Sequence, residues 1–397
     1  MPKKFIYNLL SNAFNDKDIK VGIDVLKSRN ITISKITNKF EKYFAKKIGA
    51  KYALMTNSGS SANLLAFSCL TNPLNDDKID DDSEVIIPAV CWSTSLWPII
   101  QSGLKPKFVD IDLDSLNINL NDLKKKISKK TKAILIVHVL GNCVDMSELM
   151  RVVKKHNLIL IEDTCESLGT KYKNKYLGTF GDFSSFSFYS SHQISSGEGG
   201  MICCKNNDDH EIIKSLRAHG WSRGLKNEKK IAAANKHLDS RFIFYNSGFN
   251  LRSTDIAASI GLNQFKDIDQ FIKKRSINRD KILKMFKKKI KMMKYLSFID
   301  ANNHVEASWF GIPILLSKKI NRNKFLKKIE KLGVETRPII SGNFLKQPSI
   351  KKYKLNKKSN FKNSDIVNNH GFFIGLPTSA ISDNNIKKLV GAFEKSL

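Results

Sequence analysis

The chain has 397 residues, of which 41% are hydrophobic, and its formal net charge is +30. A chain of this length can bury a large core, and no apolar run is long enough to span a bilayer. The N-terminus lacks the apolar stretch and the small-residue cleavage site of a signal peptide, so we expect a cytoplasmic globular protein that does not bind membranes.

The positive charge raises the question of nucleic-acid binding, because lysine patches release counterions from a phosphate backbone. The lysines are spread along the whole chain, and local clusters such as 124–126 and 287–289 lack any helix-turn-helix, zinc-finger or aromatic-stacking pattern. We therefore expect no nucleic-acid partner. A positive field can still attract an anionic nucleotide substrate.

The six cysteines are scattered and show no spacing typical of zinc or an iron–sulfur centre. The adjacent pair Cys203 and Cys204 would point to opposite faces of a strand, which makes it a poor metal clamp. We predict reduced core cysteines and no metal site.

The first half of the chain predicts alternating strands and helices. A charged helical region extends to about residue 48, with Ser34 or Thr37 as a cap before its last helix. Strands are predicted at 51–55, 84–87, 107–111, 133–137 and 158–161, with a helical segment after each of the first four. This order indicates βαβ units and a mainly parallel sheet covered on both faces. Ligand sites in such sheets lie at the carboxyl ends of the strands, so Asp163 belongs on the site side.

Two turns in this half are rich in serine and glycine. Residues 56–62 open a helix at 63–70, and exposed N–H groups there favour an anion such as phosphate; an ordinary helix cap is the alternative. Residues 181–200 begin as a strand of alternating aromatic and serine positions, continue through a turn and lead into a second strand at 200–204.

The second half predicts a helix from Asp208, a polar insertion to about residue 240, and one long helical stretch from Ser253 or Thr254 towards Lys289. A strand at 310–316, a helix at 321–332, a segment at 334–340 and a terminal helix after Ser382 follow. We predict a large cofactor-binding domain at 1–255, and a linking helix with a small C-terminal α+β domain at 256–397.

Seven short motifs occur together and in order over most of the chain. They are 57–62 (NSGSSA), 88–92 (PAVCW), 108–112 (FVDID), 161–166 (IEDTCE), 187–192 (SFYSSH), 197–200 (GEGG) and 248–252 (GFNLR). Together they resemble the DegT/DnrJ/EryC1/StrS sugar aminotransferase family. The resemblance implies an α/β protein of fold type I among enzymes that depend on pyridoxal 5'-phosphate (PLP), acting as a homodimer with a shared active site.

His192 stands where the family places the lysine that holds the cofactor covalently. The substitution is local, since no lysine or arginine occurs between Lys175 and Lys205. With 217–221 (RAHGW) and 335–344 (ETRPIISGNF), it resembles the branch that removes the C3 hydroxyl from nucleotide-linked 4-keto-6-deoxy sugars. A lone histidine is more often structural, but this position favours a catalytic base.

The resemblance therefore implies a non-covalent cofactor that rests as pyridoxamine 5'-phosphate (PMP), with no iron–sulfur cluster, since residues 206–397 contain no cysteine. The expected substrate is GDP-4-keto-6-deoxy-D-mannose, for deoxysugar and O-antigen biosynthesis, and L-glutamate is expected to regenerate PMP. Two alternatives stay open: a dehydratase for a CDP-linked 4-keto-6-deoxyglucose, and a catalytically silent protein that binds nucleotide sugar.

The same resemblance implies roles for further residues. Asp163 faces the ring nitrogen of the cofactor and keeps it protonated; a helix cap is the alternative. Trp92 stacks on the ring, or is a core tryptophan. Phosphate contacts are expected from Gly59, Ser60 and Ser187, a contact near the ring hydroxyl from Glu166, and a phosphate contact across the dimer from Asn250. His219, Arg252 and Arg337 are candidates for binding diphosphate or the carboxylates of the donor.

Overall fold

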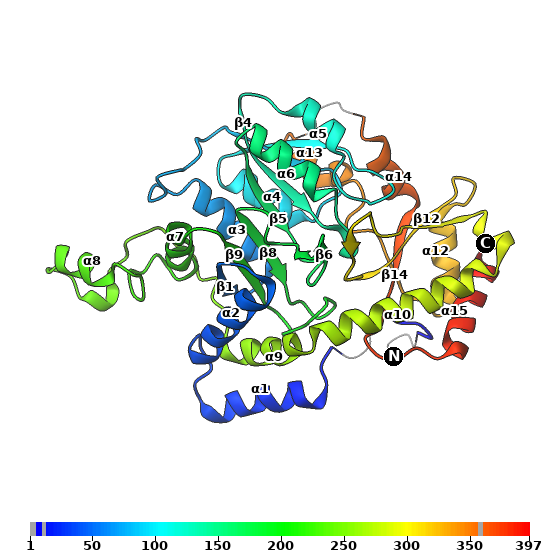
Figure 1. Ribbon diagram of the computed structural model, residues 1–397, viewed down its shortest axis with the longest axis horizontal. Helices are drawn as coiled ribbons and strands as arrows, with labels where there is room; N and C mark the ends of the chain where they lie inside the picture. Colours follow the sequence, from blue (N-terminus) through cyan, green and yellow to red (C-terminus); the bar gives the residue numbers. More distant parts are fainter. Residues whose placement is uncertain (1–4, 10–12, 356–359) are drawn as a thin grey trace.

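A seven-stranded sheet lies at the centre of the computed structural model, which describes residues 5–9, 13–355 and 360–397 (Figure 1). The strand order is β1-β9-β8-β5-β4-β2-β3, and only β9 runs against its neighbours. The strands are β1 Tyr52–Thr56, β2 Glu84–Pro88, β3 Lys105–Val109, β4 Thr131–Val137, β5 Ile159–Asp163, β8 Phe183–Ser187 and β9 Gly200–Cys204. The prediction of a mainly parallel sheet is confirmed.

Helices cover both faces of this sheet, as strands buried on two sides require. One face packs against α3 (Gly59–Leu70), α4 (Ser93–Gln101) and α7 (Asn207–Arg217). The other face packs against α5 (Leu120–Lys126) and α6 (Met146–Lys155), and against α2 (Lys35–Ile48) and α9 (Asp255–Lys266). Cys203 and Cys204 lie in cores on opposite faces, as the strand pattern predicts.

The start of α2 is capped by a residue from far along the chain. Ser34 is the N-cap residue, as expected, but its side chain does not cap the helix. Instead Oδ1 of Asp255, the first residue of α9, accepts hydrogen bonds from the N–H groups of Ser34 (2.9 Å) and Thr37 (3.0 Å). Helix α1 (Asp16–Ser28) lies along α9, so the N-terminal helices and α9 form one packed layer (Figure 1).

The long helical stretch predicted from residue 253 to Lys289 is two helices, because Asp267 leaves the helical conformation (φ −99°, ψ 7°). Helix α9 ends there and α10 (Ile268–Lys287) follows. Helix α9 packs on α1 and α2, whereas α10 packs on the terminal helix α15 (Asp383–Ser396). The division of the chain at residues 255 and 256 stays a prediction.

The C-terminal part contains a four-stranded antiparallel sheet in the order β10-β12-β14-β13. Its strands are β10 Leu296–Phe298, β12 Gly311–Leu316, β13 Thr336–Arg337 and β14 Gly371–Gly375, and α10, α12 (Arg322–Lys331) and α15 pack on it. The sequence did not predict β14 or α14 (Lys362–His370), which precedes it.

Smaller elements complete the described part of the chain. They are the strands β6 Lys171–Tyr172, β7 Lys175–Tyr176 and β11 Val305–Glu306, and the helices α8 Glu228–Ala234, α11 Ile290–Met293, α13 Pro348–Lys352, η1 Val139–Gly141, η2 Ser240–Phe242 and η3 Phe344–Lys346. Helix α8 belongs to the predicted polar insertion and projects from the body of the molecule (Figure 1). No helix in the described ranges is long and apolar enough to cross a membrane.

Candidate functional site

A cavity of about 450 Å³ lies at the carboxyl ends of β4, β5 and β8, whose last residues Val137, Asp163 and Ser187 line it. The C-terminal part closes it with Phe310, Arg337 and Phe373. Its other lining residues come mainly from the serine- and glycine-rich turns: Ser58, Gly59, Ser60, Asn63, Trp92, Thr94, Cys165, Glu166, Tyr189, Ser191, His192, Glu198, Pro338 and Ile340. This is the edge of the sheet at which parallel α/β proteins bind ligands.

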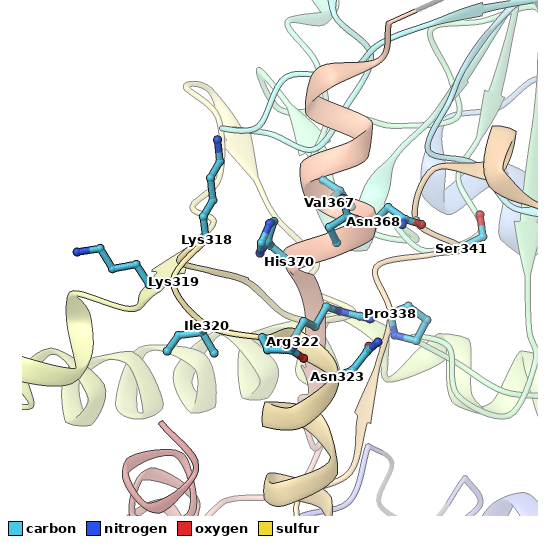
Figure 2. Close-up of a pocket in the computed structure, with 13 residues that line it drawn as sticks. Lys318, Lys319, Ile320, Arg322, Asn323, Pro338, Ser341, Val367, Asn368 and His370 are labelled. Carbon is cyan, nitrogen blue, oxygen red and sulfur yellow. Dashed lines mark hydrogen bonds between the residues drawn. The ribbon is translucent and has the colours of Figure 1, made fainter.

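A larger cleft of about 790 Å³ lies in the C-terminal part, between the start of α12 and the end of α14 (Figure 2). Lysines, asparagines, Arg322 and His370 line it, and none of its described lining residues is acidic. Pro338, Ser341 and Gly342 of the 335–344 motif line it, but none of the predicted site residues does. The smaller cavity is therefore the candidate active site.

The first turn of α3 is held close to the floor of the cavity. Ser58 caps the helix by accepting a hydrogen bond of 3.1 Å from the N–H of Ser61. A Cβ at Gly59 would lie 2.7 Å from Sγ of Cys165 and 2.8 Å from Cβ of Ser187, so only glycine fits there. The hydroxyl of Ser60 lies 2.9 Å from that of Thr94. The helix N-terminus thus presents N–H groups and hydroxyls, which suit an anion.

Asp163 is a buried carboxylate held by neutral donors. Its Oδ2 accepts hydrogen bonds from Nδ2 of Asn63 (2.9 Å) and from Oγ of Ser95 (2.8 Å). Its Oδ1 accepts one of 3.2 Å from the N–H of Cys165. These donors fix the carboxylate at the cavity wall without neutralising its charge, so it can pair with a cation such as a protonated ring nitrogen.

Trp92 and Glu166 lie on the same cavity. Trp92 is 56% exposed although it is large and apolar, which is unusual for a core tryptophan and leaves its face open to a ligand. Burial, with a smaller contribution from the charge of Asp163, raises the pKa of Glu166 to about 7, although Oε2 accepts a 3.0 Å hydrogen bond from the N–H of Leu140.

The imidazole of His192 lines the cavity between two aromatic rings. Its ring packs edge-on against Phe310 (centroids 5.1 Å apart) and against Tyr189 (6.0 Å). Nδ1 is buried without a hydrogen-bond partner among the described residues. Burial, together with the charge of Arg275, lowers the pKa of His192 to about 3, so the ring is neutral near neutral pH. No lysine is among the described residues that line the cavity.

Three of the predicted site residues lie outside the cavity, in a cluster on the segment that follows α7. Nη2 of Arg252 lies 3.1 Å from Nε2 of His219, and Nε of Arg252 donates to Oδ1 of Asn250 at 3.1 Å. The guanidinium groups of Arg252 and Arg223 lie over the ring of Trp221. Arg337 does line the cavity, and it pairs with Glu335 at 2.8 Å.

Several residues that form the site, either on its wall or just behind it, have no signal in our sequence analysis. Asn63 lies four residues after Gly59, which places it one helical turn further along α3, and Ser95 follows Trp92 within the first turn of α4. These spacings could have pointed to them. Phe310 and Phe373 reach the cavity only through the placement of the C-terminal sheet, which no local pattern reveals.

The geometry fits a flat aromatic cofactor that carries a phosphate. The cavity offers an open aromatic face, a buried carboxylate and a helix N-terminus, as the ring, the ring nitrogen and the phosphate of PLP require. Residues 13–394 match the model of the DegT/DnrJ/EryC1/StrS aminotransferase family. The chain belongs to this family, as its motifs predict.

Individual relatives cover nearly the whole chain. The GDP-4-keto-6-deoxy-D-mannose 3-dehydratase of Escherichia coli is 35% identical over 375 residues, which are 93% of this chain and 95% of the relative. A solved variant of GDP-4-keto-6-deoxymannose-3-dehydratase with bound GDP-perosamine has a TM-score of 0.89 at 33% identity, covering 98% of this chain and 100% of that one. A solved GDP-4-keto-6-deoxymannose-3-dehydratase with a trapped PLP-glutamate geminal diamine has a TM-score of 0.88 at 34% identity, with the same coverage.

Proposed function

We propose that this protein is a PLP-dependent 3-dehydratase that removes the C3 hydroxyl of GDP-4-keto-6-deoxy-D-mannose. The product is a GDP-linked 4-keto-3,6-dideoxy sugar, formed together with ammonia. L-Glutamate donates the amine and leaves as 2-oxoglutarate, so the oxygen lost from C3 balances the oxygen that the donor gains. The similarity to dehydratases of this name over nearly the full chain supports the reaction and the substrate.

The observation that carries the proposal is the histidine on the wall of a cavity that no lysine of the described residues lines. A lysine at this place would hold the cofactor covalently and favour reversible transfer of the amine. An imidazole cannot hold it in that way, but it can still move a proton. Bound here, the cofactor supplies an amine for the C4 ketone and an electron-accepting ring.

Different lining residues would bind different parts of the cofactor. Asp163, fixed by Asn63 and Ser95, holds the proton of the ring nitrogen. Trp92 covers one face of the ring. The N-terminus of α3 with Gly59 and Ser60, together with Ser187, would hold the phosphate. Glu166 has a pKa of about 7, so it can donate to or accept from the ring hydroxyl.

His192 is the base: a nitrogen of its imidazole accepts a proton, and the same nitrogen donates the proton again when the C3 oxygen leaves. A pKa of about 3 makes imidazole a weak base. The phosphate of the cofactor and the diphosphate of the substrate bring negative charge to the cavity, and nearby negative charge raises the pKa of a histidine. The loaded site therefore holds a stronger base than the protein alone.

A second subunit completes the site in this proposal. Asn250, His219 and Arg252 lie outside the cavity of their own chain, and they adjoin an exposed aromatic surface that includes Phe242, Phe244 and Tyr245. An exposed apolar surface of this kind suits an interface. In a homodimer, Asn250 would contact the partner's cofactor phosphate, while His219 and Arg252 meet the diphosphate.

The cytoplasm is the compartment that fits this function. The six cysteines are unpaired, as expected in a reducing compartment, and nucleotide sugars and glutamate are metabolites of the cytoplasm.

The deciding experiment is a product assay with GDP-4-keto-6-deoxy-D-mannose, glutamate and PLP, run with the wild type, His192→Asn and His192→Lys. We expect the 3-deoxy product and 2-oxoglutarate from the wild type only. His192→Lys should hold the cofactor covalently, with absorbance at a longer wavelength, and lose deoxygenation. Full dehydratase activity in His192→Asn would contradict the proposed base.

Two further measurements distinguish the proposal from its alternatives. A CDP-linked 4-keto-6-deoxyglucose that is turned over faster than the GDP-linked sugar would favour the CDP-sugar dehydratase. A catalytically silent binding protein would show no cofactor in an absorbance scan and no change when substrate is added.

A further inference from the structure

Three arginines are buried in the described part of the chain, and one of them has no acidic partner. Arg217 pairs with Glu41 at 2.6 Å, and Arg279 pairs with Asp300 at 2.7 Å. Arg275 is only 3% exposed, yet no carboxylate of the described residues lies within ion-pair distance of it. An unpaired buried charge is unfavourable, so its presence calls for a role beyond packing.

The contacts of Arg275 lead to the proposed base. From α10, its Nη2 donates to the backbone carbonyl of His192 at 3.3 Å. Its Nη1 donates to the backbone carbonyl of Trp309, also at 3.3 Å. Trp309 immediately precedes Phe310, the ring that packs edge-on against the imidazole. One guanidinium therefore ties the segment of His192 to the segment of the ring beside it.

His192 lies between two cavities, and the charged side chains that surround it line one or the other. A second cavity, of about 460 Å³, is lined by His192, Arg275 and the N-terminal segment around α1. The charged or titratable side chains on the cofactor side are Asp163, Cys165, Glu166, Tyr189, Glu198 and Arg337, and those on the other side are Asp16, Asp18, Lys274 and Arg275. Of these, Arg275 is the one whose charge, after burial itself, lowers the pKa of His192.

We propose that Arg275 is a positioning residue for the proposed dehydration: it fixes the backbone of His192 against α10 and places a permanent positive charge beside the imidazole. This inference rests on the proposed role of His192 as the base. The cofactor phosphate and a substrate diphosphate both favour a protonated imidazole, which could not accept a proton. Burial and the charge of Arg275 together oppose them and keep the ring neutral in the loaded site.

The first test follows His192 itself, by NMR titration of protein labelled at histidine Cε1, with and without cofactor. The spectrum of His192→Asn identifies its resonance. In Arg275→Gln the titration midpoint should rise by about one pH unit, the usual effect of removing one nearby like charge. Arg275→Lys keeps the charge and should titrate near the wild type. Arg279→Gln is the matched control, one turn further along α10 and also buried, and should leave the midpoint unchanged.

The second test separates this inference from the proposed function. In Arg275→Gln the acidic limb of the pH profile of kcat/KM should move with the NMR midpoint. If the midpoint moves and the limb does not, His192 is not the base, although its coupling to Arg275 stands. An unmoved midpoint in folded Arg275→Gln, or an equal shift in Arg279→Gln, overturns the inference.

If Arg275→Gln does not fold, the Arg275→Lys variant still tests the positioning role. A lysine cannot donate to two carbonyls with the geometry of a guanidinium. Arg275→Lys should therefore keep the acidic limb in place while kcat falls about 10-fold through looser placement of the base. Wild-type kcat in Arg275→Lys would overturn the positioning role.

Discussion

Nε2 of His138 lies 3.0 Å from Oε2 of Glu162, and both side chains are fully buried, the first directly after β4 and the second in β5. The same carboxylate accepts hydrogen bonds from the N–H groups of Gly178 (2.9 Å), Phe180 (2.8 Å) and Gly181 (2.7 Å). Burial alone would raise the pKa of Glu162, but the contact with His138, together with the N–H groups of Gly181 and Gly178, lowers it. Glu162 in β5 thus links the segment after β4 to the loop before β8, directly next to Asp163.

Replacing this carboxylate should destabilise the protein strongly. Glu162→Gln removes the charge that satisfies four buried donors, and we expect the free energy of unfolding to fall by about 2–4 kcal/mol in urea titrations. Glu306→Gln is the control, because Glu306 is 60% exposed and pairs with Lys171 only at 3.7 Å. Equal stability of the two variants would contradict the role of Glu162.

Gly59→Ala should disturb the first turn of α3. The added Cβ would lie within 3.0 Å of both Cys165 and Ser187, so the helix must shift away from the cavity. We expect weaker PLP binding by at least about 10-fold and a loss of about 1–3 kcal/mol in stability. Gly391→Ala, in α15, is the control: nothing lies near its added Cβ, and the change should stabilise the helix. Cofactor affinity is measured by fluorescence titration.

Asp163→Asn should weaken cofactor binding without unfolding the protein. The amide retains one acceptor for Asn63 and Ser95 but cannot pair with a protonated ring nitrogen, so we expect affinity for PLP to fall about 100-fold. Ser95→Ala removes only one of the donors that orient the carboxylate, and its effect on the same titration should be smaller. The reverse order would show that the charge of Asp163 is not what binds the ring.

His192 should make the protein less stable in acid. Its pKa in the folded protein, about 3, is below the ordinary value near 6.5, so the unfolded chain binds the proton more readily between these pH values. Stability is therefore lost as the pH falls from about 6.5 towards 3, by up to about 1.4 kcal/mol per pH unit from this group. His192→Asn should show a shallower decline in urea unfolding across this range. Parallel curves for the two proteins would contradict the lowered pKa.

The family motifs identified most of the residues that line the candidate site. Asp163 is also placed by its position at the end of a β-branched strand, whereas His192 was singled out because it stands at the family's lysine position. The donors that fix Asp163 lie on two other elements, α3 and the start of α4. These donors meet at Asp163 only because of how the two helices pack, and sequence periodicity does not predict that packing.

The parts that were missed depend on contacts between distant segments. Strand β14 is a five-residue apolar run between glycines, and it is defined by pairing with β12 and β13 rather than by its own pattern. The break at Asp267 separates two helices that pack on different partners, and nothing in the helical periodicity marks it. Arg275 likewise resembled any other basic residue of a long helix until the carbonyls of His192 and Trp309 were placed against it.

The carboxylate of Asp255 at the start of α2 also has a consequence for the newly made chain. Residues 34–37 leave the ribosome more than two hundred residues before their capping partner does, and β1 must wait for β9 to be synthesised. The N-terminal segment therefore spends most of translation without its final neighbours, exposing the apolar side of α2. Emergence of α9, rather than of the first helices, is the event that allows this end of the molecule to settle.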